Sequence, residues 1–160
     1  MKWYYTISLA VAAFIVVTSF TYTESIDSPI VYPQGYRRWT HIKSGVVGPE
    51  HPNVKYRGFN HVYANDKAFQ GYESGIFPEG SVIVFDVITA ATNDHYTAEG
   101  TRDHIDVMVK DAVKFAATGG WGYAQFEGDG TPRVLTEEIT TKCYNCHLKQ
   151  SDHVFSEFRK

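Results

Sequence analysis

Near its C-terminus the chain contains the pentapeptide Cys143-Tyr144-Asn145-Cys146-His147. Two cysteines separated by two residues and followed directly by histidine form the pattern that attaches c-type haem in exported proteins. On one helical turn both thiols could reach the vinyl groups of one porphyrin, and the imidazole could bind the iron. These are the only cysteines in the chain. The motif therefore predicts one haem c, covalently attached through Cys143 and Cys146, with His147 as axial ligand of the iron.

Three other functions of a Cys-x-x-Cys pair fit the chain less well. The pair could form a structural disulfide, or it could be a thioredoxin-like redox centre. A redox centre of that kind belongs to a βαβ unit, and no such alternation of elements is visible in the sequence. A zinc site would need a second pair of ligands, for which only His153 lies nearby. Haem attachment is the function that the motif favours.

The residue opposite His147 would decide between an electron carrier and a protein that binds small ligands. An electron carrier needs a second strong iron ligand, usually Met or His. The only methionine beyond the first residue is Met108. The histidine candidates are His41, His51, His61, His95, His104 and His153. A distal wall of strands rich in aromatic residues would instead leave the sixth position open to a small diatomic molecule or a nitrogen oxide.

Length and composition limit the class of protein. The 160 residues suit one domain, since a domain usually has ~100–200 residues. Hydrophobic residues make up 43% and charged residues 21% of the chain, which is ordinary for a globular protein. The net charge of -3 argues against nucleic acid as a partner, because nucleic-acid binding requires a basic surface. Aromatic residues reach 15%, and part of this excess suits packing around a large flat cofactor.

The N-terminal segment predicts export. Lys2 precedes an apolar run at residues 7–20, which suits a signal peptide and is short for a membrane span of ~20 residues. We therefore expect a signal peptide at residues 1–23, a leader at 24–35 and a haem-binding domain at 36–160. The alternative is an uncleaved N-terminal anchor. The predicted location is periplasmic or otherwise exported, and membrane-tethered if the signal stays uncleaved.

Alternation of apolar and polar residues predicts a mainly β (α+β) fold, a small antiparallel sheet domain with a few short helices. The predicted strands cover residues 38–43, 57–63, 81–89, 104–110 and 121–127. In the fourth of these, Ile105, Val107 and Val109 share one face, and His104, Asp106 and Met108 share the other. The haem would be attached near the C-terminus.

Four short helices are predicted from capping signals and local composition. Asn65 is a good N-cap for a helix over 66–73, and Gly75 would stop it. Thr136 followed by two acids predicts a second helix start, and that helix would run into the cysteines. Two further helical segments are expected at residues 111–117 and 152–159.

Several segments beyond the pentapeptide resemble one family. They are residues 36–44 (YRRWTHIKS), 62–80 (VYANDKAFQGYESGIFPEG), 105–115 (IDVMVKDAVKF), 119–126 (GGWGYAQF) and 143–158. In these segments the chain resembles the cytochrome P-460 and cytochrome c′-beta group of monohaem c-type proteins. The resemblance implies a small antiparallel β fold, a haem held by the C-terminal Cys-x-x-Cys-His, a five-coordinate iron and a homodimer.

The two branches of this group differ at a position that matches Phe85. P-460 members carry there a lysine that crosslinks to the porphyrin, and they oxidise hydroxylamine. Members of the c′-beta branch lack the crosslink, have a distal pocket lined by Phe, and bind nitric oxide. No lysine occurs between Lys67 and Lys110. The resemblance therefore predicts no Lys–haem crosslink and Phe85 as a distal cap, where the alternative is a plain core residue of the sheet.

The resemblance also suggests polar residues of the pocket. Asp106 matches a carboxylate that takes substrate protons in P-460 members, although it is one carbon shorter than Glu and could instead be a solvent-facing strand acid. The distal Arg of P-460 members is replaced near Asn60 in this sequence. Asn60 or His61 could hydrogen-bond a ligand instead. The aromatic candidates for the pocket are Tyr56, Phe59, Trp121 and Tyr123.

Three functions remain open from the sequence. The first is a five-coordinate haem protein that binds nitric oxide or a similar ligand. The alternative is a P-460-type oxidoreductase acting on hydroxylamine or nitric oxide, with Asp106 as proton acceptor. The third is a simple electron-transfer cytochrome with Met108 or a histidine as sixth ligand. A redox partner protein would serve the last two.

Overall fold

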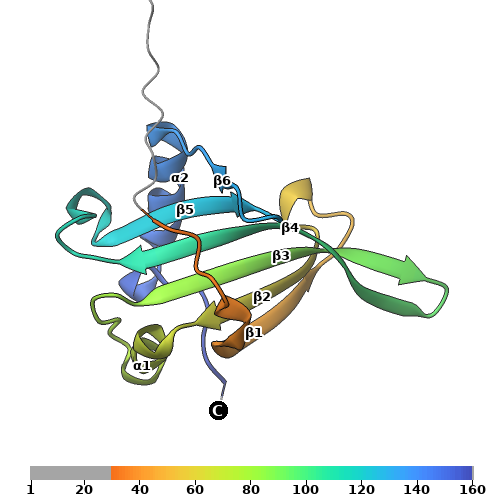
Figure 1. Ribbon diagram of the computed structural model, residues 1–160, viewed down its shortest axis with the longest axis horizontal. Coiled ribbons are helices and arrows are strands. Elements are labelled where there is room, and N and C mark those ends of the chain that lie inside the picture. The colour runs from red at the N-terminus through yellow and green to blue at the C-terminus, as the bar shows by residue number, and fades with distance from the viewer. Residues whose placement is uncertain (1–29, 160) are drawn as a thin grey trace, which may run out of the picture.

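The computed structural model describes residues 30–159, which form one antiparallel sheet flanked by short helices (Figure 1). Six strands are hydrogen-bonded in chain order from β1 to β6. They are β1 Thr40–Val47, β2 Gly58–Ala64, β3 Val82–Asn93, β4 Tyr96–Lys110, β5 Trp121–Glu127 and β6 Pro132–Arg133. The mainly β fold class is confirmed. The predicted signal peptide and residues 24–29 of the predicted leader lie outside the described residues.

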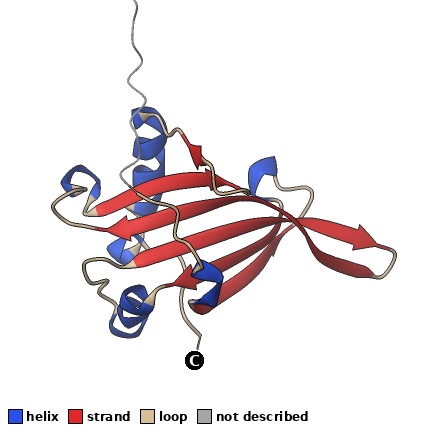
Figure 2. Ribbon diagram, viewed as in Figure 1, coloured by secondary structure: helices blue, strands red, loops and turns tan. Residues whose placement is uncertain are grey.

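The strand β3 ends later and the strand β4 begins earlier than predicted. Their outer parts form a two-stranded hairpin that projects past the rest of the sheet (Figures 1 and 2). This hairpin is almost entirely exposed, so its sequence carries no apolar alternation from which strands could be predicted. The strand β6 was also missed, because two residues are too few to show a period of two.

The two α-helices are α1 Asp66–Ser74 and α2 Glu137–His147. The Asn65 side chain accepts a hydrogen bond from the Ala68 amide at 2.8 Å, and Gly75 ends α1 at a φ of 84°. The Thr136 side chain caps α2 in the same way. None of the helices in residues 30–159 is long and apolar enough to cross a membrane.

Two of the predicted helical segments are wrong in whole or in part. Residues 111–117 contain no α-helix, and a single 3-10 turn occurs at Ala116–Thr118. The helix predicted at residues 152–159 is also absent. A 3-10 turn at Ser151–His153 is followed by non-helical chain, and Asp152 and His153 have φ of 41° and 62°. An α-helix cannot continue through this left-handed backbone.

The core is divided between the two faces of the sheet. One cluster faces α1 and α2 and includes Val62, Ile83, Met108 and Trp121. The other lies on the opposite face and includes Tyr36, Val84, Ile105, Val107 and Phe126. Ile30 is also buried in this second cluster. The predicted division of β4 into two faces therefore agrees with the structure.

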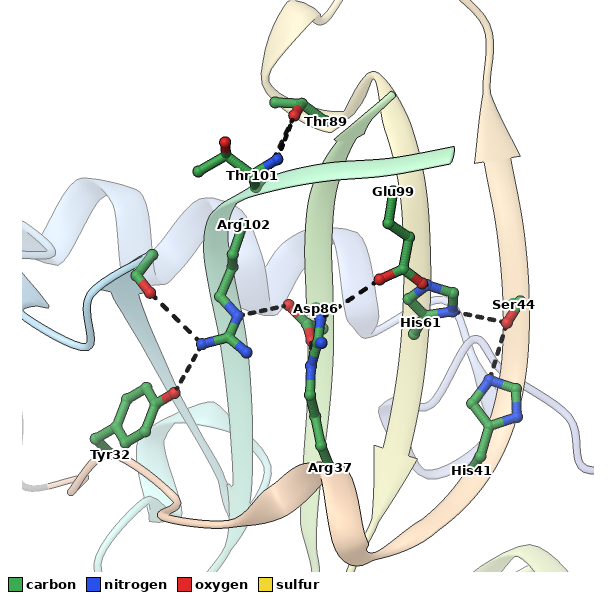
Figure 3. A network of polar contacts seen from close by, with 11 residues as sticks. Tyr32, Arg37, His41, Ser44, His61, Asp86, Thr89, Glu99, Thr101 and Arg102 are labelled. Atoms are coloured by element: carbon green, nitrogen blue, oxygen red, sulfur yellow. Dashed lines mark hydrogen bonds and ion pairs between the residues drawn. The ribbon is translucent and has the colours of Figure 1, made fainter. Parts of the chain in front are cut away.

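A polar network also lies on the face that carries the second cluster (Figure 3). The Asp86 carboxylate is fully buried and forms ion pairs with Arg37 at 2.8 Å and Arg102 at 3.2 Å. Glu99 lies 4.0 Å from Arg37 and accepts a hydrogen bond from His61 at 2.7 Å. The network pairs the buried charge and joins η1 (Tyr36–Arg38) to the sheet.

Candidate functional site

A cavity of about 760 Å³ lies between α2 and the facing side of the sheet. Its size is within the range of small-molecule and cofactor sites, ~300–1,000 Å³. Cys143, Cys146 and His147 line it from α2, and Phe85 and Asp106 line it from β3 and β4. Thus the five candidate site residues of the sequence, which lie in three separate segments, meet around one space.

The helix α2 presents the two cysteines together because residues i and i+3 lie on the same side of a helix. Cys143 is half-buried, Cys146 is exposed, and both thiols are free. Burial raises the pKa of the Cys143 thiol, so this group stays protonated near neutral pH. The two sulfurs are therefore available to a group that enters the cavity.

His147 is held in one orientation and one tautomer. Its Nδ1 donates a hydrogen bond to the carbonyl oxygen of His153 at 2.7 Å. Its ring also contacts the rings of Tyr123 and Phe155, with centroid distances of 5.3 and 4.8 Å. Burial lowers the pKa of His147. The imidazole is therefore neutral near pH 7, and Nε2 keeps the free electron pair that an iron ligand needs.

The residue before the His153 carbonyl, Asp152, is anchored through its side-chain carboxylate. One carboxylate oxygen accepts hydrogen bonds from Lys110 Nζ at 2.6 Å and Trp121 Nε1 at 3.2 Å, and the other accepts one from the Phe77 amide at 2.9 Å. Burial by itself would raise the pKa of Asp152, but these hydrogen bonds lower it overall. In the sequence Asp152 is only one position of the segment 143–158 that resembles the family, and its contacts are visible only in the fold.

Asp106 lines the cavity with its side chain 29% exposed. It accepts a hydrogen bond from Gln125 Nε2 at 2.5 Å. Asn60 is buried beside the cavity and donates to the Tyr56 carbonyl at 3.2 Å, while its own oxygen has no hydrogen-bond partner. His61 points to the opposite face, so of the two suggested ligand contacts only Asn60 is at the site. Gln125 was missed because an isolated strand glutamine carries no sequence signal.

The donor set suits a c-type haem better than a bare metal ion. Two free thiols and one neutral imidazole face a mostly apolar space. Within residues 30–159 no three His, Cys, Asp or Glu side chains are grouped closely enough to hold a metal ion. The two thiols and one imidazole therefore do not favour the zinc alternative. They match the two thioether bonds and one iron ligand that haem c requires.

The comparison with protein families agrees with this donor set. The profile of the cytochrome P460 family matches residues 33–156. The chain belongs to the cytochrome P460 family. It is therefore a c-type haem protein of that family. A search of curated proteins found no match.

In this cytochrome P460 family member the pocket side of β3 carries Phe85. The Phe85 ring packs edge-on against the Tyr56 ring, with 6.1 Å between the ring centroids. Tyr123, which contacts His147, lies on β5, two strands away from Phe85. Burial and the nearby Asp106 carboxylate raise the pKa of Tyr56. Tyr56 and Tyr123 line the cavity, whereas Trp121 is a core residue and Phe59 stacks on His61.

The candidates for a sixth iron ligand are also placed by the fold. His147 is the only histidine among the described residues that line the cavity. Met108 also lines the cavity, but it is buried in the core cluster and is the cross-strand partner of Tyr123. A thioether packed in a core cluster more often fills space than binds iron.

Proposed function

We propose that this protein is an exported monohaem cytochrome c whose five-coordinate haem binds nitric oxide or a similarly small ligand. The observation that supports this most is the cavity, in which His147 is the only histidine among the described lining residues. A bound haem would supply an iron atom able to bind such ligands and to exchange electrons. The residues of the chain hold, orient and shield it.

The proposed attachment uses both sulfurs of α2. Cys143 and Cys146 would form the thioether bonds, and His147 would bind the iron through Nε2. The His153 carbonyl keeps Nε2 as the free nitrogen by accepting a hydrogen bond from Nδ1–H. A hydrogen bond of this kind also makes a ligating imidazole more basic.

The absence of a Lys–haem crosslink is part of the proposal. On the pocket side of β3 the side chain is that of Phe85, which has no amine to form the bond. Three lysines line the cavity, but they come from β1, η2 (Val54–Tyr56) and α2 rather than from β3. They are Lys43, Lys55 and Lys142. The apolar Phe85 offers no hydrogen bond to water, which favours a small apolar ligand instead.

The test is the absorption spectrum of the purified protein, oxidised and reduced, followed by titration of the reduced form with nitric oxide. We expect a haem c spectrum that is high-spin and five-coordinate in the ferrous state, and that changes on addition of nitric oxide. A six-coordinate low-spin ferrous spectrum without added ligand would refute the proposal and favour simple electron transfer. A spectrum altered by a crosslink would refute its c′-beta character.

Replacing Phe85 by alanine is expected to let water reach the iron. The variant opens space beside Tyr56, and we expect a six-coordinate component in the ferric spectrum. It should also lower the free energy of unfolding by about 2–3 kcal/mol, somewhat less than for a fully buried phenylalanine. The measurements are ferric absorption spectra and chemical denaturation.

The control for Phe85 is Val46→Ala, which removes an exposed apolar side chain at the edge of the same cavity. This variant should keep the ferric spectrum of the wild type. If Phe85→Ala has an unchanged ferric spectrum as well, Phe85 is a core residue of the sheet and not a cap over the ligand site.

A second candidate function is oxidation of hydroxylamine or nitric oxide. It is favoured by the Asp106 carboxylate, which faces the cavity and is held by Gln125. A carboxylate there could accept protons from a nitrogen substrate as it loses electrons. Loss of hydroxylamine with an artificial electron acceptor tests this function, and no turnover in the wild type would refute it.

Export, assembly and partners belong to the same proposal. The apolar run at residues 7–20 supports export to the periplasm or beyond. The resemblance to P-460 and c′-beta proteins supports a homodimer, and an electron-exchanging protein would be the redox partner. Cell fractionation and light scattering of the purified protein test the location and the dimer.

A further inference from the structure

His104 lies completely buried between two carboxylates. Its Nδ1 is 2.5 Å from Asp103 Oδ2, and its Nε2 is 3.7 Å from Asp106 Oδ1. The Asp103 side chain is 44% exposed to solvent, whereas Asp106 lines the cavity. The three side chains therefore form a continuous series from the candidate site to the surface of the protein.

A β-bulge brings this series together. Val87 pairs with His104, and the next residue of β3, Ile88, pairs with Arg102. Asp103 is thus an extra residue of β4 without a partner in β3. In a regular strand its side chain would point to the face opposite His104. The bulge redirects the side chain toward the imidazole, as bulges beside functional sites often do.

The contacts of His104 determine where its proton lies. An ionised carboxylate only accepts hydrogen bonds, so Nδ1 donates to Asp103 and Nε2 carries the free electron pair. This buried Nε2 has no hydrogen-bond partner. Unpaired buried acceptors are uncommon and call for an explanation. The Asp106 carboxyl lies 3.7 Å from this nitrogen, and a proton could arrive from there.

Further groups lie around His104 on the neighbouring elements. The Tyr56 ring lies 5.8 Å from the imidazole, and Gln125 holds Asp106 from β5. The cross-strand partner of His104 is Glu127, whose carboxylate is paired with Arg133 at 2.5 Å. Glu127 is thus paired with Arg133, and Asp103 and Asp106 are the carboxylates that flank the imidazole.

We propose that Asp103 and His104 relay protons between Asp106 and the solvent. A proton held by Asp106 passes to Nε2, the proton on Nδ1 passes to Asp103, and Asp103 releases it to water. One proton enters, one leaves, and no electron moves through the three side chains. The imidazole then carries its proton on Nε2, and it must return to the Nδ1-protonated tautomer before the next transfer. A small rotation of the Asp106 side chain closes the 3.7 Å gap. The relay rests on the second candidate function, in which Asp106 takes protons from the substrate.

The first test measures how fast the ring proton of His104 exchanges with water. We would use ¹⁵N-histidine NMR on the haem-loaded protein in its diamagnetic ferrous carbonyl form. The expected result is a proton on Nδ1 that exchanges through Asp103, and exchange slowed at least tenfold in Asp103→Asn. The control is Glu127→Gln, which removes a neighbouring acid outside the relay and should leave the rate unchanged. A proton on Nε2, or an exchange rate insensitive to Asp103→Asn, would overturn the relay.

The second test separates the relay from the function on which it rests. If the wild type oxidises hydroxylamine, Asp103→Asn should slow turnover and change its pH profile, within the ~10²–10⁴-fold range of acid–base catalysis. Small buffer bases, which can accept the proton in place of Asp103, should restore part of the rate, which would not happen if Asp103 only stabilised the fold. A rate unchanged in this variant overturns the relay. No turnover in the wild type refutes the oxidase function, and the exchange rates alone then decide on the relay.

Discussion

Replacing Cys143 and Cys146 together with serine is expected to give a protein whose haem separates from the polypeptide in a denaturing gel. A serine hydroxyl does not add to a porphyrin vinyl group as a thiol does, so only His147 and the cavity would hold the cofactor. We expect each single replacement to keep one covalent bond and to shift the haem absorption bands. Haem-stained gels and the absorption spectrum in alkaline pyridine measure both effects.

The matched control for the cysteine variants is Asn145→Ser, which changes an exposed residue on the same helical turn. It should keep both covalent bonds and the wild-type spectrum. Haem that stays covalently attached in the double variant would mean that another side chain of the chain holds it, and the proposed attachment would be wrong.

Replacing Asp152 by alanine is expected to lower the free energy of unfolding by about 3 kcal/mol. The change leaves Lys110 without its partner and removes the acceptor of the Phe77 amide and the Trp121 indole. Breaking a buried ion pair typically costs ~3–5 kcal/mol, and the lysine here is only mostly buried. Alanine is also disfavoured at the φ of 41° that Asp152 adopts. Chemical denaturation of the haem-loaded protein gives the measurement.

The same variant should weaken the bond between the haem iron and His147. Without Asp152 the His153 carbonyl is no longer held, so the hydrogen bond to His147 Nδ1 weakens. We expect a lower iron–histidine stretching frequency in the resonance Raman spectrum of the ferrous protein. Asp152→Asn should be milder, since asparagine tolerates left-handed backbone and keeps one acceptor oxygen. An unchanged frequency in Asp152→Ala would show that the His147 ring is positioned without this residue.

The control for Asp152 is His153→Gly, which keeps the carbonyl oxygen and tolerates the φ of 62°. It should keep the iron–histidine frequency. The pKa of Asp152 is lowered in the folded protein. Its stabilising effect is therefore present above the ordinary aspartate pKa of ~3.9 and is lost as the pH falls through the lower folded value. The difference in stability between wild type and Asp152→Ala should shrink at such acidic pH.

Local features of the sequence were enough to predict much of the fold. The β-branched run at residues 81–89 matches the longer strand Val82–Asn93 from its second residue onward, and the alternation at 104–110 lies within the strand Tyr96–Lys110. Asn65, Gly75 and Thr136 marked helix ends that the structure reproduces. These features depend on nearest neighbours along the chain, which is why they can be read without the fold. The segment at residues 152–159 failed because its backbone is decided by Phe77, Lys110 and Trp121, which are distant in sequence.

At the candidate site, too, local spacing could be read from the sequence, whereas contacts between distant segments could not. The sequence by itself was enough to predict haem attachment through Cys143, Cys146 and His147, because that prediction depends only on spacing within one helical turn. Only the tertiary structure decided what surrounds them. The Asp152 contacts, the partner of Asp106 and the bulge at Asp103 each join residues from different strands or loops. Such contacts depend on register and packing between strands, and neighbouring residues in the chain do not specify them.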